Sequence, residues 1–260
     1  MHRHHERTVD RLREHVLADP TVMALIVIGS VARGEAGAGA DVDCLVVFTD
    51  EEYRRREAAG QVLLDYAALA EPPTDGVSGQ AAELAFLRDA ADRAPEPQRF
   101  AFVDALVFSK HPAVEPLVRR AASYPEHERL EKMRSFVSQL PVHHAYLAFG
   151  EYARNEYVLA QCAVQIVLFG GRLVLAHNRM LYPGRKWFMR QLDRAVAKPA
   201  RFLELARALL ARPSIAASRA FIDAVDGFAD WPRPPEGEWA RFSRDTEQNW
   251  RTRSLSPGEW

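Results

Sequence analysis

The segment Thr21–Ile28 constrains the fold of this chain more than any other. Its residues after Thr21 are all apolar, most of them are β-branched, and Gly29 ends the run. A short run that is apolar on both faces is typical of a buried central strand. The segment Asp41–Phe48 becomes equally apolar after two acidic residues at its start. We therefore predict a sheet that contains both segments, joined by a short helix through Val31–Arg33 and a loop of small residues.

The character of the pattern changes along the chain. Helical and strand-like segments alternate up to about residue 113, and only helical periods remain after it. This predicts an α+β fold, with a mixed sheet and flanking helices at 1–124 and a C-terminal helical bundle with a Trp/Pro-rich tail at 125–260. Early in the chain we expect helices at 7–18 and 50–60 and strands at 81–87 and 100–109, although the alanines and leucines of 81–87 would also suit a helix. Later we expect helices at 116–123, 126–139, 143–169, 187–197 and 202–211, separated by Pro141, Gly170-Gly171, Tyr182-Pro183-Gly184 and Pro199.

Charge and composition exclude several classes of protein. The 260 residues carry 34 Lys and Arg against 35 Asp and Glu, a formal net charge of −1. Without a global basic field, neither nucleic acid nor an anionic membrane is an expected partner. No apolar run approaches the roughly 20 residues that span a bilayer, and the N-terminus lacks the apolar core of a secretory signal. Cys44 and Cys162 lie in apolar stretches, as free thiols do in a reducing compartment. We expect a cytoplasmic protein.

Residues suited to binding phosphate and metal lie where the two predicted strands begin or end. Residues two apart on a strand share a face, so Asp41 and Asp43 place their carboxylates side by side. The two charges repel unless a cation lies between them, and Mg²⁺ takes oxygen ligands and completes its shell with phosphates. Gly29 allows a close backbone approach, and Ser30 offers a hydroxyl at a helix start. This combination predicts a Mg²⁺-dependent nucleoside triphosphate site.

The pattern Gly29-Ser30-x-x-Arg33 followed by Asp41-x-Asp43 resembles the signature of the DNA polymerase β-type nucleotidyltransferase superfamily. The closest resemblance is to the kanamycin nucleotidyltransferase group, the antibiotic-adenylylating enzymes. It extends from about residue 8 to 170 and implies a polymerase β-like domain at 1–124. Gly29, Ser30 and Arg33 would bind the triphosphate, with a local salt bridge as the alternative role of Arg33. Members that work as dimers imply a homodimer here.

The same resemblance implies a third metal-binding acid. In the kanamycin nucleotidyltransferase group this residue lies in a strand of the form Val-Glu-hydrophobic-x-Phe, which Ala82-Glu83-Leu84-Ala85-Phe86 resembles. Glu83 would then join Asp41 and Asp43 in holding one or two Mg²⁺ ions. Asp104, in the predicted strand at 100–109, is the alternative.

The general base is implied by a segment in the helical part. Phe149–Asn155 resembles the family segment that carries this base, which identifies Glu151. Glu156 competes with it. On a helix the two residues are about 140° apart, so only one of them can face a given cleft well.

The resemblance implies an enzyme that moves a nucleoside monophosphate, most simply AMP from ATP, to a hydroxyl of a small molecule. An aminoglycoside or lincosamide antibiotic is the acceptor that it suggests, which would make this a resistance enzyme. One alternative is a nucleotidyltransferase of a toxin–antitoxin pair that modifies protein or RNA. Another is a non-catalytic nucleotide-binding regulator with the same fold.

Overall fold

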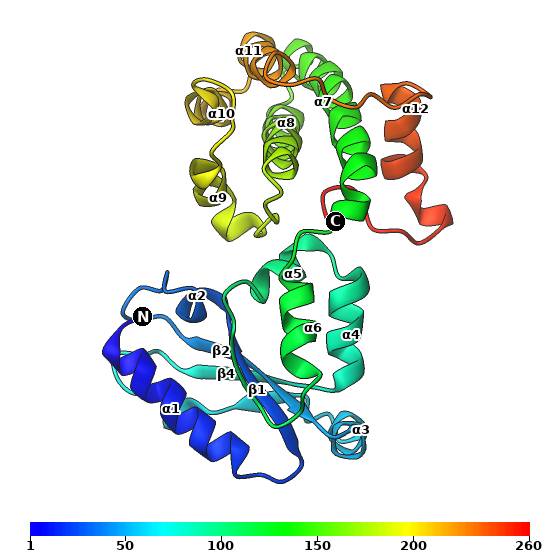
Figure 1. The fold of residues 1–260 in the computed structure, drawn as a ribbon. Coiled ribbons are helices and arrows are strands. Elements are labelled where there is room, and N and C mark those ends of the chain that lie inside the picture. Colours follow the sequence, from blue (N-terminus) through cyan, green and yellow to red (C-terminus); the bar gives the residue numbers. More distant parts are fainter. The chain divides into compact units, whose positions relative to one another are not determined.

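The computed structural model describes residues 1–260, and the chain forms two compact units, Met1–Ser123 and Tyr124–Trp260. The first unit combines a sheet with helices, and the second contains only helices and turns. The predicted α+β class, with a mixed sheet preceding a helical part, is therefore confirmed (Figure 1).

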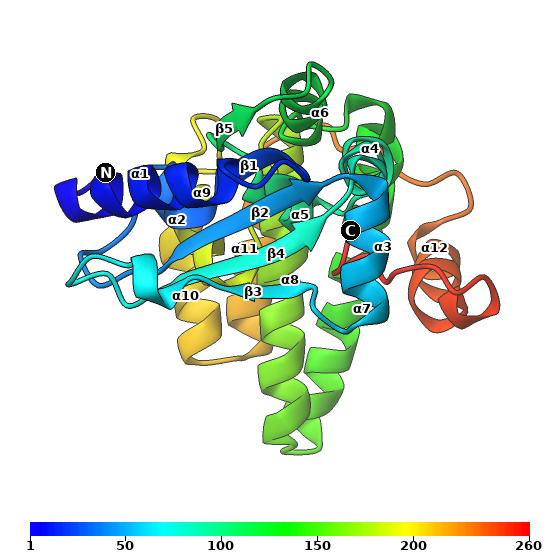
Figure 2. The same cartoon turned by 90° about the horizontal axis from the view of Figure 1, so that it is seen from below.

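The first unit is built on a five-stranded sheet with the order β3-β4-β2-β1-β5. The central strand β1 runs antiparallel to both β2 and β5, whereas β4 runs parallel to β2. Figure 2 shows β2, β4 and β3 lying in this order beside one another. The sheet is therefore mixed, and its two predicted central strands are confirmed. The strands are β1 Val22–Ile28, β2 Val42–Phe48, β3 Leu63–Asp65, β4 Val77–Ala82 and β5 Leu106–Ser109.

Each face of the sheet packs against its own helices (Figure 1). Helix α1 covers one face, where its Leu12 packs with Leu25 and Val46. Helices α4 and α6 cover the other face, where Leu87 and Val118 pack with strand residues. Because side chains alternate along a strand, both faces bury apolar groups, and this explains why the two central strands are apolar throughout. The helices of this unit are α1 Arg3–Leu17, α2 Gly29–Ala32, α3 Asp50–Ala58, α4 Leu84–Arg93, α5 Glu96–Ala101 and α6 Val114–Ala121.

Two strand predictions in the first unit were wrong. Strand β4 ends at Ala82, and the segment predicted as a strand at 81–87 mostly belongs to helix α4. Its alanines and leucines favour a helix, and this preference decides the structure. The segment predicted as a strand at 100–109 is divided between helix α5, a turn, and the short strand β5.

The second unit is organised around the antiparallel helices α7 and α8. Helix α8 is long and apolar enough to cross a membrane by length and composition, with a mean hydropathy of 1.8 over its most apolar window. Of that window, 61% is buried inside the unit, as expected for a core helix. The remaining helices pack around the pair. The helices are α7 Arg129–Tyr152, α8 Glu156–His177, α9 Phe188–Arg194, α10 Phe202–Ala211, α11 Ile215–Asp226 and α12 Glu238–Phe242.

Two helix breaks predicted in this unit were also wrong. Pro141 lies inside α7, although an interior proline costs about 3 kcal/mol in a helix. Its neighbours Leu140 and Val142 are fully buried, so packing on both sides keeps the helix continuous. Gly170-Gly171 lies inside α8, where an added Cβ would come within 2.5 Å of Phe221 and 2.3 Å of Phe188, respectively. These glycines allow neighbouring helices to approach closely.

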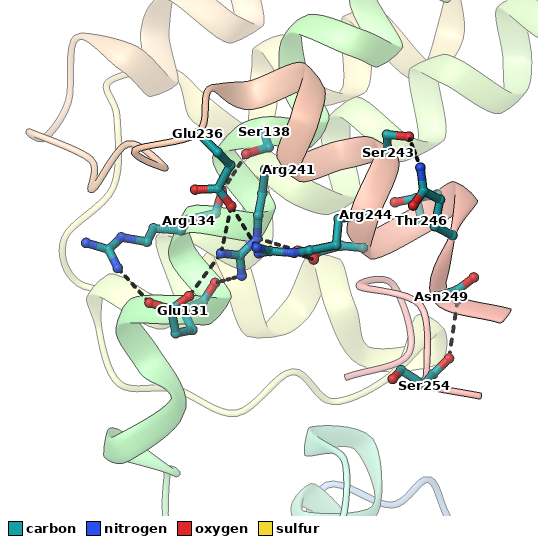
Figure 3. A network of polar contacts seen from close by, with 12 residues as sticks. Glu131, Arg134, Ser138, Glu236, Arg241, Ser243, Arg244, Thr246, Asn249 and Ser254 are labelled. Carbon is teal, nitrogen blue, oxygen red and sulfur yellow. Dashed lines mark hydrogen bonds and ion pairs between the residues drawn. The ribbon is translucent and has the colours of Figure 1, made fainter. Parts of the chain in front are cut away.

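The buried side chain of Arg241 connects the C-terminal tail to helix α7 of the same unit (Figure 3). Arg241 of α12 donates to the Glu131 carboxylate of α7 at 2.9 Å and to Asp245 at 2.5 Å. Only 7% of the Arg241 side chain is exposed, so removing its acidic partners would leave a buried charge unpaired. Of the tryptophans in this tail, Trp231 is buried, whereas Trp239 and Trp250 are exposed.

Candidate functional site

The centre of the candidate site is the turn between β1 and α2. Gly29 adopts a φ of +77°, and a Cβ placed on it would lie 2.9 Å from Oδ2 of Asp43. Asp43 is paired with Ile28, the last residue of β1, so its carboxylate reaches directly over the turn. A left-handed φ and the absence of a side chain are both required here, and only glycine supplies them. The carboxylate thus lies against the backbone at the start of α2.

The sheet face that carries Asp43 is open at this end. Asp43 shares its face with Leu45 and Val47, which α4 and α6 cover further along the strand. On the adjoining strand β4, Ser78 is paired with Asp43 and Gln80 with Leu45, and both are exposed. The helices therefore leave the Asp43 end of this face accessible to a ligand.

Asp41 is the second acid of the candidate site, beside Asp43. It directly precedes β2 and is exposed, while Asp43 is partly buried. Asp41 lies two residues before Asp43, the spacing at which an extended chain directs side chains to the same face. The two carboxylates supply oxygen ligands of the kind that Mg²⁺ prefers. Together with the side-chain-free backbone at Gly29, this donor set fits a divalent cation that is shared with a phosphate.

Ser30 and Arg33 follow Gly29 in and after the single turn of α2. Ser30 is partly buried, and its hydroxyl makes no hydrogen bond within the protein. Arg33 instead pairs with Glu35 at 3.1 Å and places its guanidinium 4.6 Å from the centre of the Phe100 ring. Only 5% of the Arg33 side chain is exposed. The structure thus gives Arg33 the local salt bridge that was its alternative role, and leaves Ser30 accessible.

The structure does not bring Glu83 to Asp43. Strand β4 runs parallel to β2, and Asp43 is opposite Ser78, five residues before Glu83. Glu83 therefore lies at the opposite end of the sheet, where it precedes α4. Burial, followed by the negative charge of Asp50, raises the pKa of Glu83. At about 3.3 Å per residue, the separation along the strand is far too long for a shared metal ion. The predicted triad of Asp41, Asp43 and Glu83 is corrected accordingly.

Asp104, the alternative third acid, lies at the correct end of the sheet. Strand β5 is antiparallel to β1 and pairs Leu106 with Val27, so the residues just before β5 flank Gly29. Asp104 is exposed in this turn, with a φ of 55°. No three His, Cys, Asp or Glu side chains of the chain are close enough together to form a metal cluster. Asp104 is thus a neighbour of the acidic pair and not a third member of a preformed cluster.

Glu151 has a structural contact in the helical unit. Its Oε2 accepts a hydrogen bond of 2.6 Å from the backbone N–H of Ile215, the first residue of α11. A carboxylate at a helix N-terminus satisfies a free N–H group and interacts favourably with the helix dipole. Glu156 is the first residue of α8, directly after the N-cap Asn155, and is exposed. Glu151 lies in the last turn of α7 and accepts from the start of α11, whereas Glu156 itself begins α8.

Ser78 and Gln80 are site-facing residues that the sequence analysis missed. They alternate with buried Val77, Gly79 and Ala81 in β4. The signal that could have identified them is this alternation, which begins four residues before the segment that was predicted as a strand.

One family profile matches the part of the chain that carries this site. Residues 7–87 match the family profile described as a nucleotidyltransferase domain. The matched span contains the Gly29 turn and the acidic pair Asp41 and Asp43. The chain is also similar to a nucleotidyltransferase-like protein from Exiguobacterium sibiricum 255-15, with a TM-score of 0.44, 13% identity, and coverage of 96% of this chain and 81% of that one. No curated protein matches the sequence.

Proposed function

We propose that this chain is a Mg²⁺-dependent nucleotidyltransferase that moves AMP from ATP to a hydroxyl of a small molecule. The observation that carries the proposal is the contact between Asp43 and the Gly29 turn, on the open end of a sheet face and within the span that matches the nucleotidyltransferase profile. This contact places a carboxylate beside backbone groups that can approach a phosphate.

Each residue of the site would have its own role toward the metal or the phosphates. Asp41 and Asp43 would hold the metal, which neutralises phosphate charge when it is bound. The backbone at Gly29 and the hydroxyl of Ser30 would orient the outer phosphates of the nucleotide. Asp104 replaces Glu83 as the candidate for a third acid, because it flanks Gly29 at the same end of the sheet.

We propose Glu151 as the base that accepts the proton of the acceptor hydroxyl. One of its carboxylate oxygens accepts from Ile215, and a carboxylate has lone pairs for further hydrogen bonds. Its exposure supports this role, because a base must reach solvent or substrate to pass on the proton. The aminoglycoside or lincosamide class remains our proposal for the acceptor, on the resemblance described above.

A label-transfer experiment tests the proposal. The full chain would be incubated with Mg²⁺ and ATP labelled at the α-phosphate, in the presence of a panel of hydroxyl-bearing aminoglycosides and lincosamides. We expect the label to appear on at least one acceptor with release of pyrophosphate, and Asp43→Asn to abolish this transfer. Glu83→Gln is the matched control, since it changes an acid of the same domain at the opposite end of the sheet.

A further inference from the structure

The loop that leads into Asp41 is attached to helix α1 by two histidine side chains. Residues 34–40 lie between α2 and β2 and are glycines and alanines apart from one glutamate. Nε2 of His4 lies 2.8 Å from the carbonyl oxygen of Ala38, and Nε2 of His5 lies 3.0 Å from that of Ala40. A carbonyl oxygen can only accept, so each histidine donates. Because glycines give the loop wide conformational freedom, these two hydrogen bonds restrain its course.

The ring of His5 is fully buried, and one of its two nitrogens is unpaired. Nδ1 is buried without a hydrogen-bond partner, whereas Nε2 donates to Ala40. Burial lowers the pKa of His5, so the ring is neutral and carries its single proton on Nε2. A buried polar atom without a partner is destabilising, and an apolar side chain would avoid this cost. The hydrogen bond to Ala40 is therefore what a histidine supplies at this position and an apolar residue does not.

The hydrogen bond from His5 fixes one of the two peptide groups that flank Asp41. The carbonyl of Ala40 and the N–H of Asp41 belong to one planar peptide group, so a bond to the oxygen restrains the whole plane. The next peptide group is held as well, because the N–H of Val42 donates to the carbonyl oxygen of Gly76 at 3.0 Å. With both planes held, the direction of the Cα–Cβ bond of Asp41 is set.

Asp41 depends on such anchoring more than Asp43 does. Asp43 lies within β2, where it is paired with Ile28 of β1 on one side and with Ser78 of β4 on the other. Asp41 precedes β2, is exposed, and lies outside the residues that are paired in the sheet. The sheet therefore positions one carboxylate of the acidic pair, and the other needs support from outside the sheet.

We propose that His5 is a positioning residue of the acidic pair, whose hydrogen bond to Ala40 holds the Asp41 carboxylate in the direction that a shared divalent cation requires. This role rests on the proposed function, in which Asp41 and Asp43 hold the metal. His5 itself touches neither metal nor nucleotide, and its effect passes through the backbone between Ala40 and Asp41. Groups that orient a metal ligand commonly contribute about tenfold or more to metal affinity.

Binding of Mn²⁺, which takes the same oxygen ligands as Mg²⁺, tests this role without a transfer reaction. Titration of the full chain with Mn²⁺ alone, followed by EPR, gives the Kd, and Asp43→Asn identifies the binding that comes from the acidic pair. His5→Leu keeps a buried side chain of similar size but removes the donor, and should weaken Mn²⁺ binding about tenfold. His5→Gln should bind within about twofold of wild type, because its amide nitrogen can take the place of Nε2. His5→Asn, whose shorter amide does not reach Ala40, should bind as weakly as His5→Leu.

Val16→Ala is the control for a general loss of stability. Val16 is buried near the C-terminal end of α1 and packs in the apolar core of the first unit, so this variant should lose stability and keep its Mn²⁺ affinity. Urea unfolding of each variant measures the stability.

Three outcomes would overturn the role of His5. They are equal Mn²⁺ binding in wild type and His5→Leu, equal weakening in Val16→Ala, and equal binding in His5→Gln and His5→Asn. The last comparison decides the question if His5→Leu does not fold. If Asp43→Asn binds Mn²⁺ as tightly as wild type, the metal site of the proposed function fails, and the role of His5 fails with it.

Discussion

The carboxylate of Asp43 occupies the space that a side chain at residue 29 would need, with 2.9 Å between its Oδ2 and a Cβ built on Gly29. The acid and the glycine are therefore one structural unit. A change at either position alters the other, even though β1 and β2 contribute them separately.

We expect Gly29→Ala to abolish nucleotidyl transfer. The left-handed φ alone should cost about 1–2 kcal/mol in unfolding free energy, and the new methyl group would also displace the Asp43 carboxylate. Gly60→Ala is the control, because Gly60 has a φ of +69° and nothing within 4 Å of an added Cβ. That variant should lose similar stability and keep its activity. Chemical denaturation and the label-transfer assay measure the two effects, and equal activity in both variants would contradict this expectation.

Asp104→Asn should reduce transfer by at least about tenfold, since it removes a negative charge beside the acidic pair. Glu83→Gln should keep transfer within about twofold of wild type, because Glu83 lies at the far end of β4 and its charge acts on Asp50 instead. Initial rates at saturating ATP, measured across a Mg²⁺ titration, separate the two. A severe defect in Glu83→Gln alongside a normal Asp104→Asn would restore the original assignment.

Glu151→Gln should slow single-turnover transfer by about 10²–10⁴-fold, the usual contribution of a positioned base. Its amide oxygen can still accept from Ile215, so the unfolding free energy should hardly change. Glu151→Ala should in addition lose about 0.5–2 kcal/mol, the usual effect of removing a side-chain acceptor at a helix start. The matched variant is Glu156→Gln, which we expect to be near neutral. If Glu151→Gln transfers normally, Glu151 of α7 serves only to cap the N-terminus of α11.

The stability of the chain should fall as the pH drops from 7 to 5, in part because of His143. Its pKa is about 4 in the folded protein against about 6.5 when unfolded, so between these values the unfolded chain binds the extra proton. The contribution is fully present above pH 6.5 and is lost as the pH falls toward 4. His143→Phe should remove about 2 kcal/mol of this dependence between pH 7 and 5. Urea unfolding of both proteins at several pH values measures it, and parallel curves would contradict the assignment.

The sequence was sufficient to predict strands β1 and β2, because each depends on a local pattern. Apolar residues on both strand faces and a period of two are visible without any tertiary information. The position of Glu83 depends on the direction in which β4 runs beside β2, which no local pattern contains. Strand β4 itself is short and carries polar Ser78 and Gln80 on its open side, so its pattern is weak. The strand was predicted instead in the alanine-rich segment 81–87, most of which lies after β4.

Pro141 failed as a helix break for a related reason. Local propensity opposes a helix there, but the buried neighbours Leu140 and Val142 stabilise it by more than the lost hydrogen bond costs. The role of Glu151 at α11 was equally invisible, because its partner Ile215 is 64 residues away in the chain. Contacts at such separation are decided by the fold as a whole.

The paired glycines of α8 limit which substitutions the helical unit can accept during evolution. A methyl group at residue 170 would meet Phe221 of α11, and one at residue 171 would meet Phe188 of α9. Helices α9 and α11 thus pack directly against adjacent backbone positions of α8. Any side chain at residue 170 or 171 would clash with one of them. Variation in this unit should accumulate instead at positions such as Tyr152 and Val196, which are more than 90% exposed.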